Sequence, residues 1–358
     1  MIPIAQPIIE EEEKQAVLEV LESGMLAQGR QVEEFEEAFS QMCGVKYAIA
    51  TSSGTTALHL AVLAHGIAEG DEVITSPFTF IASANSILFV GARPVFVDID
   101  LNTFHLNPEQ VEKAITSKTK AIMPVHLYGL CCDMEAIQTI TEKYRLVIIE
   151  DACQSHLAEY NGKMAGSFGT GTFSFYPTKN ITSAEGGMIT TNDQSLAEEC
   201  RLLRNHGMQR RYYHEKLGFN FRMTNLHAAI GLAQIKKIER FTSARRANAE
   251  YYDRNLKGVI TPIETQNCKH VYHQYTIRVP DGKRDTLREH LTQKGIGTEI
   301  YYPLPIHHQG FYQTLLGDQH FPNAEKAAME VLSIPVHPLL TNDDSEFVVN
   351  TINSFMQG

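Results

Sequence analysis

Short apolar runs alternate with helical patterns from about residue 15 to residue 240. Because the runs are short and mostly apolar, they predict strands that helices bury on both faces. Helical patterns lie between them, for example at 56–65, 108–115 and 134–144. This alternation predicts an α/β domain built on a doubly wound, mostly parallel sheet. The predicted strands are 47–50, 72–75, 94–97, 121–125, 146–149, 171–175 and 187–190.

The pattern changes after a long polar helix predicted at 239–255. Residues 271–279 alternate like a strand with one solvated face, and 284–294 have the spacing of an amphipathic helix. A second short strand is predicted at 299–302. We therefore expect a large domain over residues 1–240, with 1–14 as an N-terminal arm, and a smaller α+β domain over 241–358.

Composition and charge narrow the class of protein. Apolar residues make up 43% and charged residues 20% of the 358 residues, as in soluble globular proteins. No apolar run reaches the roughly 18 residues of a membrane helix, and the N-terminus lacks a signal-peptide pattern. A net charge of −11 argues against a nucleic-acid partner, which needs a basic surface. The six cysteines are scattered, without a CxxC pair or histidines at metal spacing. We expect a cytoplasmic protein with reduced thiols and no metal site.

A Ser/Gly/Thr turn at residues 51–56 follows the first predicted strand and opens a helix. The N-terminus of a helix offers free backbone N–H groups and the positive end of the dipole, which together bind anions. Simple helix capping explains the same residue types. The turn is therefore a candidate phosphate site, and its importance depends on what lies near it.

Two side chains at the ends of later strands suggest what the phosphate would belong to. Asp151 ends the run 146–149 and would be costly to bury without a cation, unless it caps the next helix. Lys179 follows the apolar run 171–175 and a proline, where burial would lower its pKa and make the amine a nucleophile for a Schiff base. A solvated loop lysine is the alternative. A phosphate site, an acid for a protonated pyridine nitrogen and an aldehyde-capturing lysine together indicate pyridoxal 5'-phosphate (PLP).

The sequence resembles the PLP-dependent sugar aminotransferases of the DegT/DnrJ/EryC1/StrS family over nearly its whole length, from residues 24–29 to 334–338. The resemblance implies the type I (aspartate aminotransferase) fold, in agreement with the predicted α/β architecture. Its most specific motifs are Ser53-Gly54-Thr55, Asp151-Ala152-Cys153-Gln154, Ser174-Phe175-Tyr176-Pro177-Thr178-Lys179-Asn180 and Gly218-Phe219-Asn220-Phe221-Arg222-Met223-Thr224.

The resemblance also implies a role for each residue near the PLP ring. Lys179 would form the covalent bond to PLP and act as the catalytic base, and Asp151 would pair with the pyridine nitrogen. Gln154 would reach the ring hydroxyl, and Phe80 would stack on the ring.

The phosphate end of the cofactor would be held by residues from two subunits. Gly54, Thr55 and Ser174 would bind it from one subunit, and Asn220 would reach it from the other. The resemblance thus implies a homodimer with shared active sites.

The implied reaction transfers an amino group, with glutamate as the donor, to a nucleotide-linked keto-sugar. Two alternatives remain open at this stage. One is amination of a cyclitol or another non-nucleotide ketone, which fewer arginines at the acceptor site would favour. The other is a catalytically silent PLP-binding regulator, against which intact Lys179, Asp151 and Gln154 count.

Overall fold

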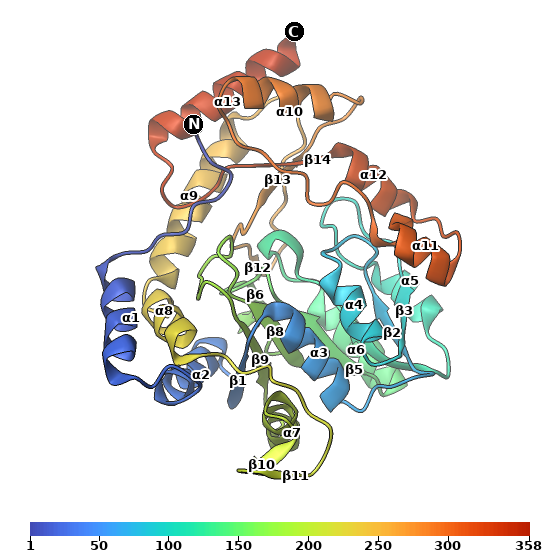
Figure 1. Cartoon of the computed structure of the whole chain (residues 1–358). Helices are drawn as coiled ribbons and strands as arrows, with labels where there is room; N and C mark the ends of the chain where they lie inside the picture. Colours follow the sequence, from blue (N-terminus) through green and yellow to red (C-terminus); the bar gives the residue numbers. More distant parts are fainter.

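A seven-stranded sheet forms the centre of the molecule, and the computed structural model describes the whole chain, residues 1–358 (Figure 1). The strand order is β1-β9-β8-β5-β4-β2-β3. Each of the seven predicted apolar runs overlaps one strand of this sheet, which confirms the α/β fold. The strands are β1 (Tyr47–Thr51), β2 (Glu72–Thr75), β3 (Arg93–Phe96), β4 (Thr119–Met123), β5 (Val147–Asp151), β8 (Thr170–Ser174) and β9 (Gly187–Thr191).

Only β9 runs against the other strands. It pairs antiparallel with both β1 and β8, so those two strands run in the same direction. The pairs β8–β5, β5–β4, β4–β2 and β2–β3 are parallel. The carboxyl ends of six strands therefore meet at one edge, where ligands bind in sheets of this kind.

Helices cover both faces of the sheet, as the apolar runs predict. On β1, Ile49 packs with Leu60 on one face, while Ala48 and Ala50 pack with Phe39 on the other. The first face carries α3 (Gly54–Ala64), α4 (Ala82–Leu88) and α7 (Gln194–Arg204). The second carries α2 (Arg30–Cys43), α5 (Pro108–Ala114), α6 (Met134–Tyr144) and α8 (Asn225–Ile235).

A second, smaller sheet lies above the first, and the two are linked by the long helix α9 (Ile238–Asn255) (Figure 1). It contains β13 (Tyr275–Arg278) and β14 (Val331–Ile334), which pair antiparallel. Helices α10 (Arg284–Gln293), α12 (Pro322–Glu330) and α13 (Asn342–Gln357) surround it. They contribute to a core of 26 buried residues that also includes residues of α9 and of the loops after the large sheet's strands. The division of the chain at residue 240 stays a prediction.

Two strand predictions in this part of the chain are wrong in extent. Within 271–279, only Tyr275–Arg278 forms a strand, because the N–H groups of Val271 and Gln274 bond the carbonyls of Gly129 and Tyr128 in the large sheet's loops. Residues 299–302 form a single bridge, between Glu299 and Ser333. The chain then leaves the sheet.

The N-terminal segment lies against the smaller sheet's helices. The N–H of Ile2 donates to the carbonyl of Gly295 at 2.8 Å, and the N–H of Gly297 donates to the carbonyl of Ile2 at 2.7 Å. Helix α1 (Glu11–Ser23) then packs on α8. The arm therefore contacts both parts of the chain.

None of the helices has both the length and the apolar character that spanning a membrane requires.

The remaining elements are short. The short elements are β6 (Glu159–Tyr160), β7 (Lys163–Met164), β10 (Met208–Arg210), β11 (Tyr213–His214), β12 (Cys268–Lys269), α11 (Gly310–Leu316) and the 3₁₀ turns η1 (Leu127–Gly129) and η2 (Ile306–His308).

Candidate active site

One cavity of about 890 Å³ opens at the carboxyl edge of the large sheet and is closed from the other side by residues that precede η2. It brings together seven of the eight predicted site residues and leaves Asn220 outside. The seven that line the cavity are Gly54, Thr55, Phe80, Asp151, Gln154, Ser174 and Lys179.

The N-terminus of α3 forms one end of the cavity. Ser53 caps this helix: its hydroxyl accepts from the N–H of Thr56 at 3.1 Å, and its own N–H donates to the Thr56 hydroxyl at 2.9 Å. Gly54 and Thr55, the first two residues of the helix, have no helical acceptor for their N–H groups. The end of α3 is thus rigid and offers free donors to an anion.

Close backbone approaches shape this anion site. A Cβ atom on Gly54 would lie 2.7 Å from Cβ of Ser174 and 3.1 Å from Sγ of Cys153. A Cβ atom on Gly187, at the start of β9, would overlap the carbonyl group of Ser53. Glycine at both positions lets β8 and β9 come up against the α3 terminus, so that the Ser174 hydroxyl can serve the same anion as the helix N–H groups.

Asp151 lies buried at the end of β5, with 6% of its surface exposed. Its Oδ2 accepts a 2.6 Å hydrogen bond from the Ser83 hydroxyl, and its Oδ1 accepts one from the N–H of Cys153 at 3.2 Å. It makes no ion pair with a protein cation. A buried carboxylate with only neutral partners suits a ligand that brings its own positive charge, so the residues present fit a protonated pyridine ring.

Lys179 enters the cavity from the loop after β8, where its N–H closes a turn onto the carbonyl of Tyr176 at 2.9 Å. Burial lowers the pKa of its amine, while the nearby Cys153 and Asp151 oppose that shift. A lysine with a lowered pKa keeps more of its neutral, nucleophilic form at physiological pH. The structure thus places Lys179 in the setting that its sequence predicts.

Gln154 is held in place by its neighbours. Its Oε1 accepts from the N–H of Tyr128 at 2.8 Å, and its Nε2 donates to the hydroxyl of Tyr302 at 3.2 Å. Phe80 is 55% exposed, and its ring centroid lies 6.3 Å from that of Tyr302. An exposed aromatic ring at the wall of a cavity is available to cover a flat ligand.

Asn220 lies outside the cavity, on the exposed segment that follows the β10–β11 hairpin. Its Oδ1 accepts from Nε of Arg222 at 3.1 Å, and its backbone bridges to Asn205. Within its own chain it therefore contributes nothing to the anion site at α3.

Sequence reasoning missed the wall that the C-terminal part of the chain supplies. Six residues of this part line the cavity: His273, Gln274, Glu299, Tyr301, Tyr302 and Pro303. It also missed Ser83, which lies inside α4 and reaches Asp151. Only the run of two tyrosines and a proline at 301–303 hints at a special role in the sequence.

Several other histidines and arginines of the large domain lie outside the cavity. His126 is buried and lies 3.0 Å from Oε2 of Glu150, which explains it as a structural residue. Arg204 is also buried and binds Glu36 at 2.6 Å. Arg210 and Arg211 are exposed on the hairpin, make no ion pair and lie over Tyr213 and Tyr212.

Known proteins are similar to this chain over nearly its whole length. The model of the DegT/DnrJ/EryC1/StrS aminotransferase family matches residues 7–353. A GDP-perosamine synthase of Caulobacter vibrioides is 43% identical over 366 residues, which cover 99% of this chain and 98% of that protein. A protein of Geobacillus stearothermophilus named pleiotropic regulatory protein is 47% identical over 345 residues, which cover 94% of this chain and 92% of that one.

Solved structures agree with the fold. DesV of S. venezuelae, in complex with a ketimine intermediate, has a TM-score of 0.93 and 37% identity, covering 97% of this chain and 95% of its own. NtdA of Bacillus subtilis, with bound cofactor PMP, has a TM-score of 0.91 and 33% identity, covering 98% of this chain and 83% of its own.

Proposed function

Because the chain belongs to the DegT/DnrJ/EryC1/StrS aminotransferase family, we propose that it transfers an amino group from glutamate to a nucleotide-linked keto-sugar. Family membership makes it a PLP-dependent aminotransferase. The observation that carries the proposal is one cavity in which Lys179, Asp151 and the α3 terminus come together.

PLP, when bound, supplies an electron-withdrawing ring that stabilises the negative charge left when a carbon loses its proton. In our proposal Gly54, Thr55 and Ser174 bind its phosphate, and Phe80 covers one face of its ring. Gln154 faces the ring hydroxyl, with its amide oriented by Tyr128 and Tyr302.

In our proposal two side chains of the protein take part in the reaction directly, Lys179 and Asp151. The Lys179 amine takes the Cα proton from the donor amino acid, and in the second half of the reaction it returns a proton to the sugar carbon that is aminated. Asp151 would pair with the pyridine nitrogen, and its carboxylate is held in place by Ser83 and the N–H of Cys153.

The nucleotide-linked acceptor is supported by relatives and by unpaired arginines. Besides the GDP-perosamine synthase, a protein named dTDP-3-amino-3,6-dideoxy-alpha-D-galactopyranose transaminase is 41% identical. In an acidic protein, a diphosphate has to be held by local cations. Arg210 and Arg211 are exposed and make no ion pair, but they do not line the cavity of their own chain. In the proposed homodimer they would offer bidentate contacts to a diphosphate at the partner's site.

A screen of nucleotide-linked keto-sugars with glutamate tests this function. We expect 2-oxoglutarate to be released in proportion to amino-sugar formed with at least one GDP- or dTDP-linked acceptor. The same screen includes free keto-sugars and keto-cyclitols at equal concentration. Turnover with these alone would overturn the nucleotide-linked assignment while leaving the transaminase intact.

The relative named pleiotropic regulatory protein is the observation that favours a second candidate, a regulatory PLP-binding protein. Against it stands the complete set of Lys179, Asp151 and Gln154 in one cavity. A regulator without catalysis would bind PLP but would release no keto acid from glutamate, even in a single turnover. The glutamate half-reaction alone therefore separates the two candidates.

We also propose that the protein is a homodimer in which Asn220 completes the partner's phosphate site. Asn220 lies on an exposed segment that also carries Leu217, a leucine with 83% of its surface exposed. The Asn220 side chain contacts Arg222 and does not line the cavity of its own chain. A hydrogen bond to a charged group contributes about 1.5–3 kcal/mol. We therefore expect Asn220→Ala to weaken PLP binding by about ten- to a hundredfold in a titration followed by fluorescence.

Mixing variants tests whether this contact is made between subunits. A heterodimer of Asn220→Ala with Lys179→Ala has one site with both defects and one site with neither. At a PLP concentration too low to load the Asn220→Ala homodimer, activity should therefore return on subunit exchange. An active monomer in sedimentation, or a mixture that stays inactive after proven exchange, would refute the shared site.

Ser83 is predicted to position Asp151. Ser83→Ala removes the 2.6 Å hydrogen bond to Oδ2, and we expect kcat to fall about tenfold while PLP stays bound. Ser83→Thr should restore most of the rate. The matched control is Ser86→Ala, since Ser86 lies one turn later in α4 and bonds only the Ser83 carbonyl. An unchanged kcat in Ser83→Ala would remove this role.

A further inference from the structure

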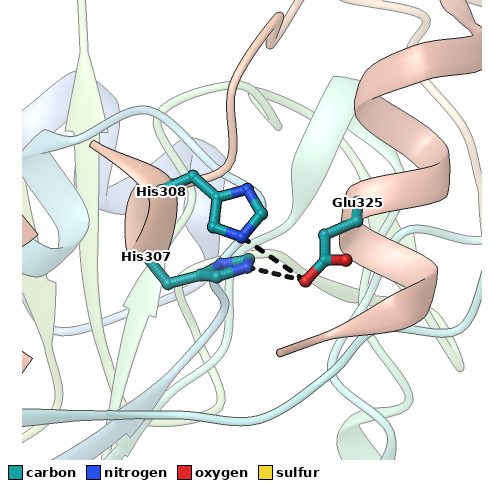
Figure 2. A group of neighbouring side chains, drawn as sticks. All are labelled: His307, His308 and Glu325. Carbon is teal, nitrogen blue, oxygen red and sulfur yellow. Dashed lines mark hydrogen bonds and ion pairs between the residues drawn. The ribbon is translucent and has the colours of Figure 1, made fainter. Parts of the chain in front are cut away.

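His307, His308 and Glu325 point toward one another, and both imidazoles face the same carboxylate oxygen (Figure 2). The two histidines lie on η2, and the glutamate lies in the first turns of α12, so the residues come from two separate elements. None of them lines the cavity. The expectation of no metal site came from the scattered cysteines alone, and the 16 residues between His308 and Glu325 hide this cluster in the sequence.

The distances within this cluster fit a tetrahedral metal ion. Nε2 of His307 lies 3.1 Å and Nε2 of His308 lies 3.6 Å from Oε1 of Glu325. All three ligand atoms lie within 4.8 Å of one another. Ligands at about 2.0–2.1 Å from a tetrahedral zinc ion are separated by about 3.3 Å. The two imidazoles and the carboxylate therefore need little movement to bind one ion.

Hydrogen bonds alone do not account for the crowding at Oε1 of Glu325. Besides the two imidazole nitrogens, this oxygen lies 2.9 Å from the N–H of Phe321 and 2.9 Å from Nδ1 of His320. A carboxylate oxygen offers about two acceptor positions. Three of these nitrogens lie within hydrogen-bond distance of an oxygen with about two acceptor positions, and Nε2 of His308 lies just beyond that distance. A cation between the imidazoles and the carboxylate would relieve this competition.

The elements that carry the cluster are fixed by independent contacts. The carboxylate of Asp98 accepts from the N–H groups of Asn323 and Ala324, both at 2.9 Å, and holds the start of α12. The N–H of Ile306 donates to the carbonyl of Pro77 at 2.8 Å and holds η2. His307 is almost completely buried, with 1% of its side chain exposed, whereas His308 is 31% exposed and opens the cluster to solvent. The site is therefore preformed and accessible.

We propose that His307, His308 and Glu325 bind a zinc ion, with water at the fourth position. Two histidines and one glutamate are a ligand set that zinc accepts. His320 contacts Oε2 of Glu325 at 2.8 Å and orients the carboxylate. The bound ion joins η2 to α12 and so steadies residues 301–303, which line the cavity three residues before η2.

The surroundings of His307 set the expected affinity. Its Nδ1 is buried and has no hydrogen-bond partner. Zinc-binding histidines usually donate this second nitrogen to a carboxylate or carbonyl group, which strengthens the metal bond. We therefore expect micromolar affinity, weaker than that of a structural zinc site with complete partners.

Zinc titration of the full-length holoenzyme, without a polyhistidine tag and after dialysis against EDTA, tests the proposal. We expect one zinc ion per chain with micromolar Kd in calorimetry, and a thermal midpoint that rises with ZnCl₂. Cobalt(II) in place of zinc should give the strong visible absorption of a tetrahedral site.

Three variants separate a specific site from general zinc binding. His308→Gln should weaken zinc binding at least a hundredfold and abolish the thermal shift, and His320→Gln should weaken it about tenfold. His290→Gln, a partly buried histidine on α10, is the matched control and should bind as the wild type does. Circular dichroism checks that each variant is folded. A wild type without a stoichiometric site, or His308→Gln with unchanged affinity, would show that the cluster is only a hydrogen-bonded network.

Discussion

Lys179→Ala should produce a folded protein that binds PLP without a covalent bond and does not turn over. The substitution removes the only lysine that lines the cavity, and with it, in our proposal, both the nucleophile and the base. General base catalysis alone contributes about 10²–10⁴-fold, and loss of the covalent attachment adds to it. We therefore expect kcat to fall by at least about 10⁴-fold.

The wild type should be yellow, and borohydride should bleach its visible band while fixing PLP to Lys179. Peptide mapping of the reduced protein identifies the modified lysine. Lys294→Ala, at an exposed lysine after α10, is the control and should keep the wild-type colour and rate. A reduced adduct on any other lysine would disprove the assignment of Lys179.

Much of the large sheet could be predicted because each central strand is a short apolar run buried on both faces. The direction in which a strand runs cannot be predicted from such an apolar run. The run at 187–190 looks like the others, yet β9 is the strand that runs opposite to its neighbours. In the smaller sheet, residues 271–274 alternate like a strand but bond to the loop at 128–129, which lies more than 140 positions away in the sequence.

In the candidate site, too, residues with a local sequence pattern could be predicted, whereas residues placed by long-range contacts could not. Residues at the ends of predicted strands, such as Asp151 and Ser174, could be placed because the carboxyl ends of parallel strands share one edge. Ser83 could not, because a serine within a helix gives no sign that its hydroxyl reaches a carboxylate 68 positions later. Tyr302 reaches Gln154 only through the packing of the two parts of the chain, which no local pattern encodes.

Asp151→Asn should leave the fold intact but slow both halves of the reaction. The amide has the shape of the carboxylate. Its oxygen can accept from the N–H of Cys153 while its NH2 group donates to the Ser83 hydroxyl, so both buried contacts at the end of β5 can be kept. In our proposal, what is lost is the negative charge that pairs with the pyridine nitrogen. An opposite charge at close range shifts a pKa by about 1–3 units, so its removal lowers the protonated fraction of the ring by about 10- to 1000-fold.

We therefore expect the glutamate half-reaction of Asp151→Asn to slow by about a hundredfold or more and PLP to bind more weakly. Single-turnover mixing with glutamate, followed by loss of the visible band, measures the rate without the second substrate. Asp193→Asn is the matched control: it makes the same exchange at the N-cap of α7, where asparagine caps as well as aspartate does. Since Asp193 lies outside the cavity, Asp193→Asn should carry out the glutamate half-reaction at the wild-type rate. A wild-type rate in Asp151→Asn would mean that the carboxylate does not hold the charge of the ring, and another group would have to be found for that role.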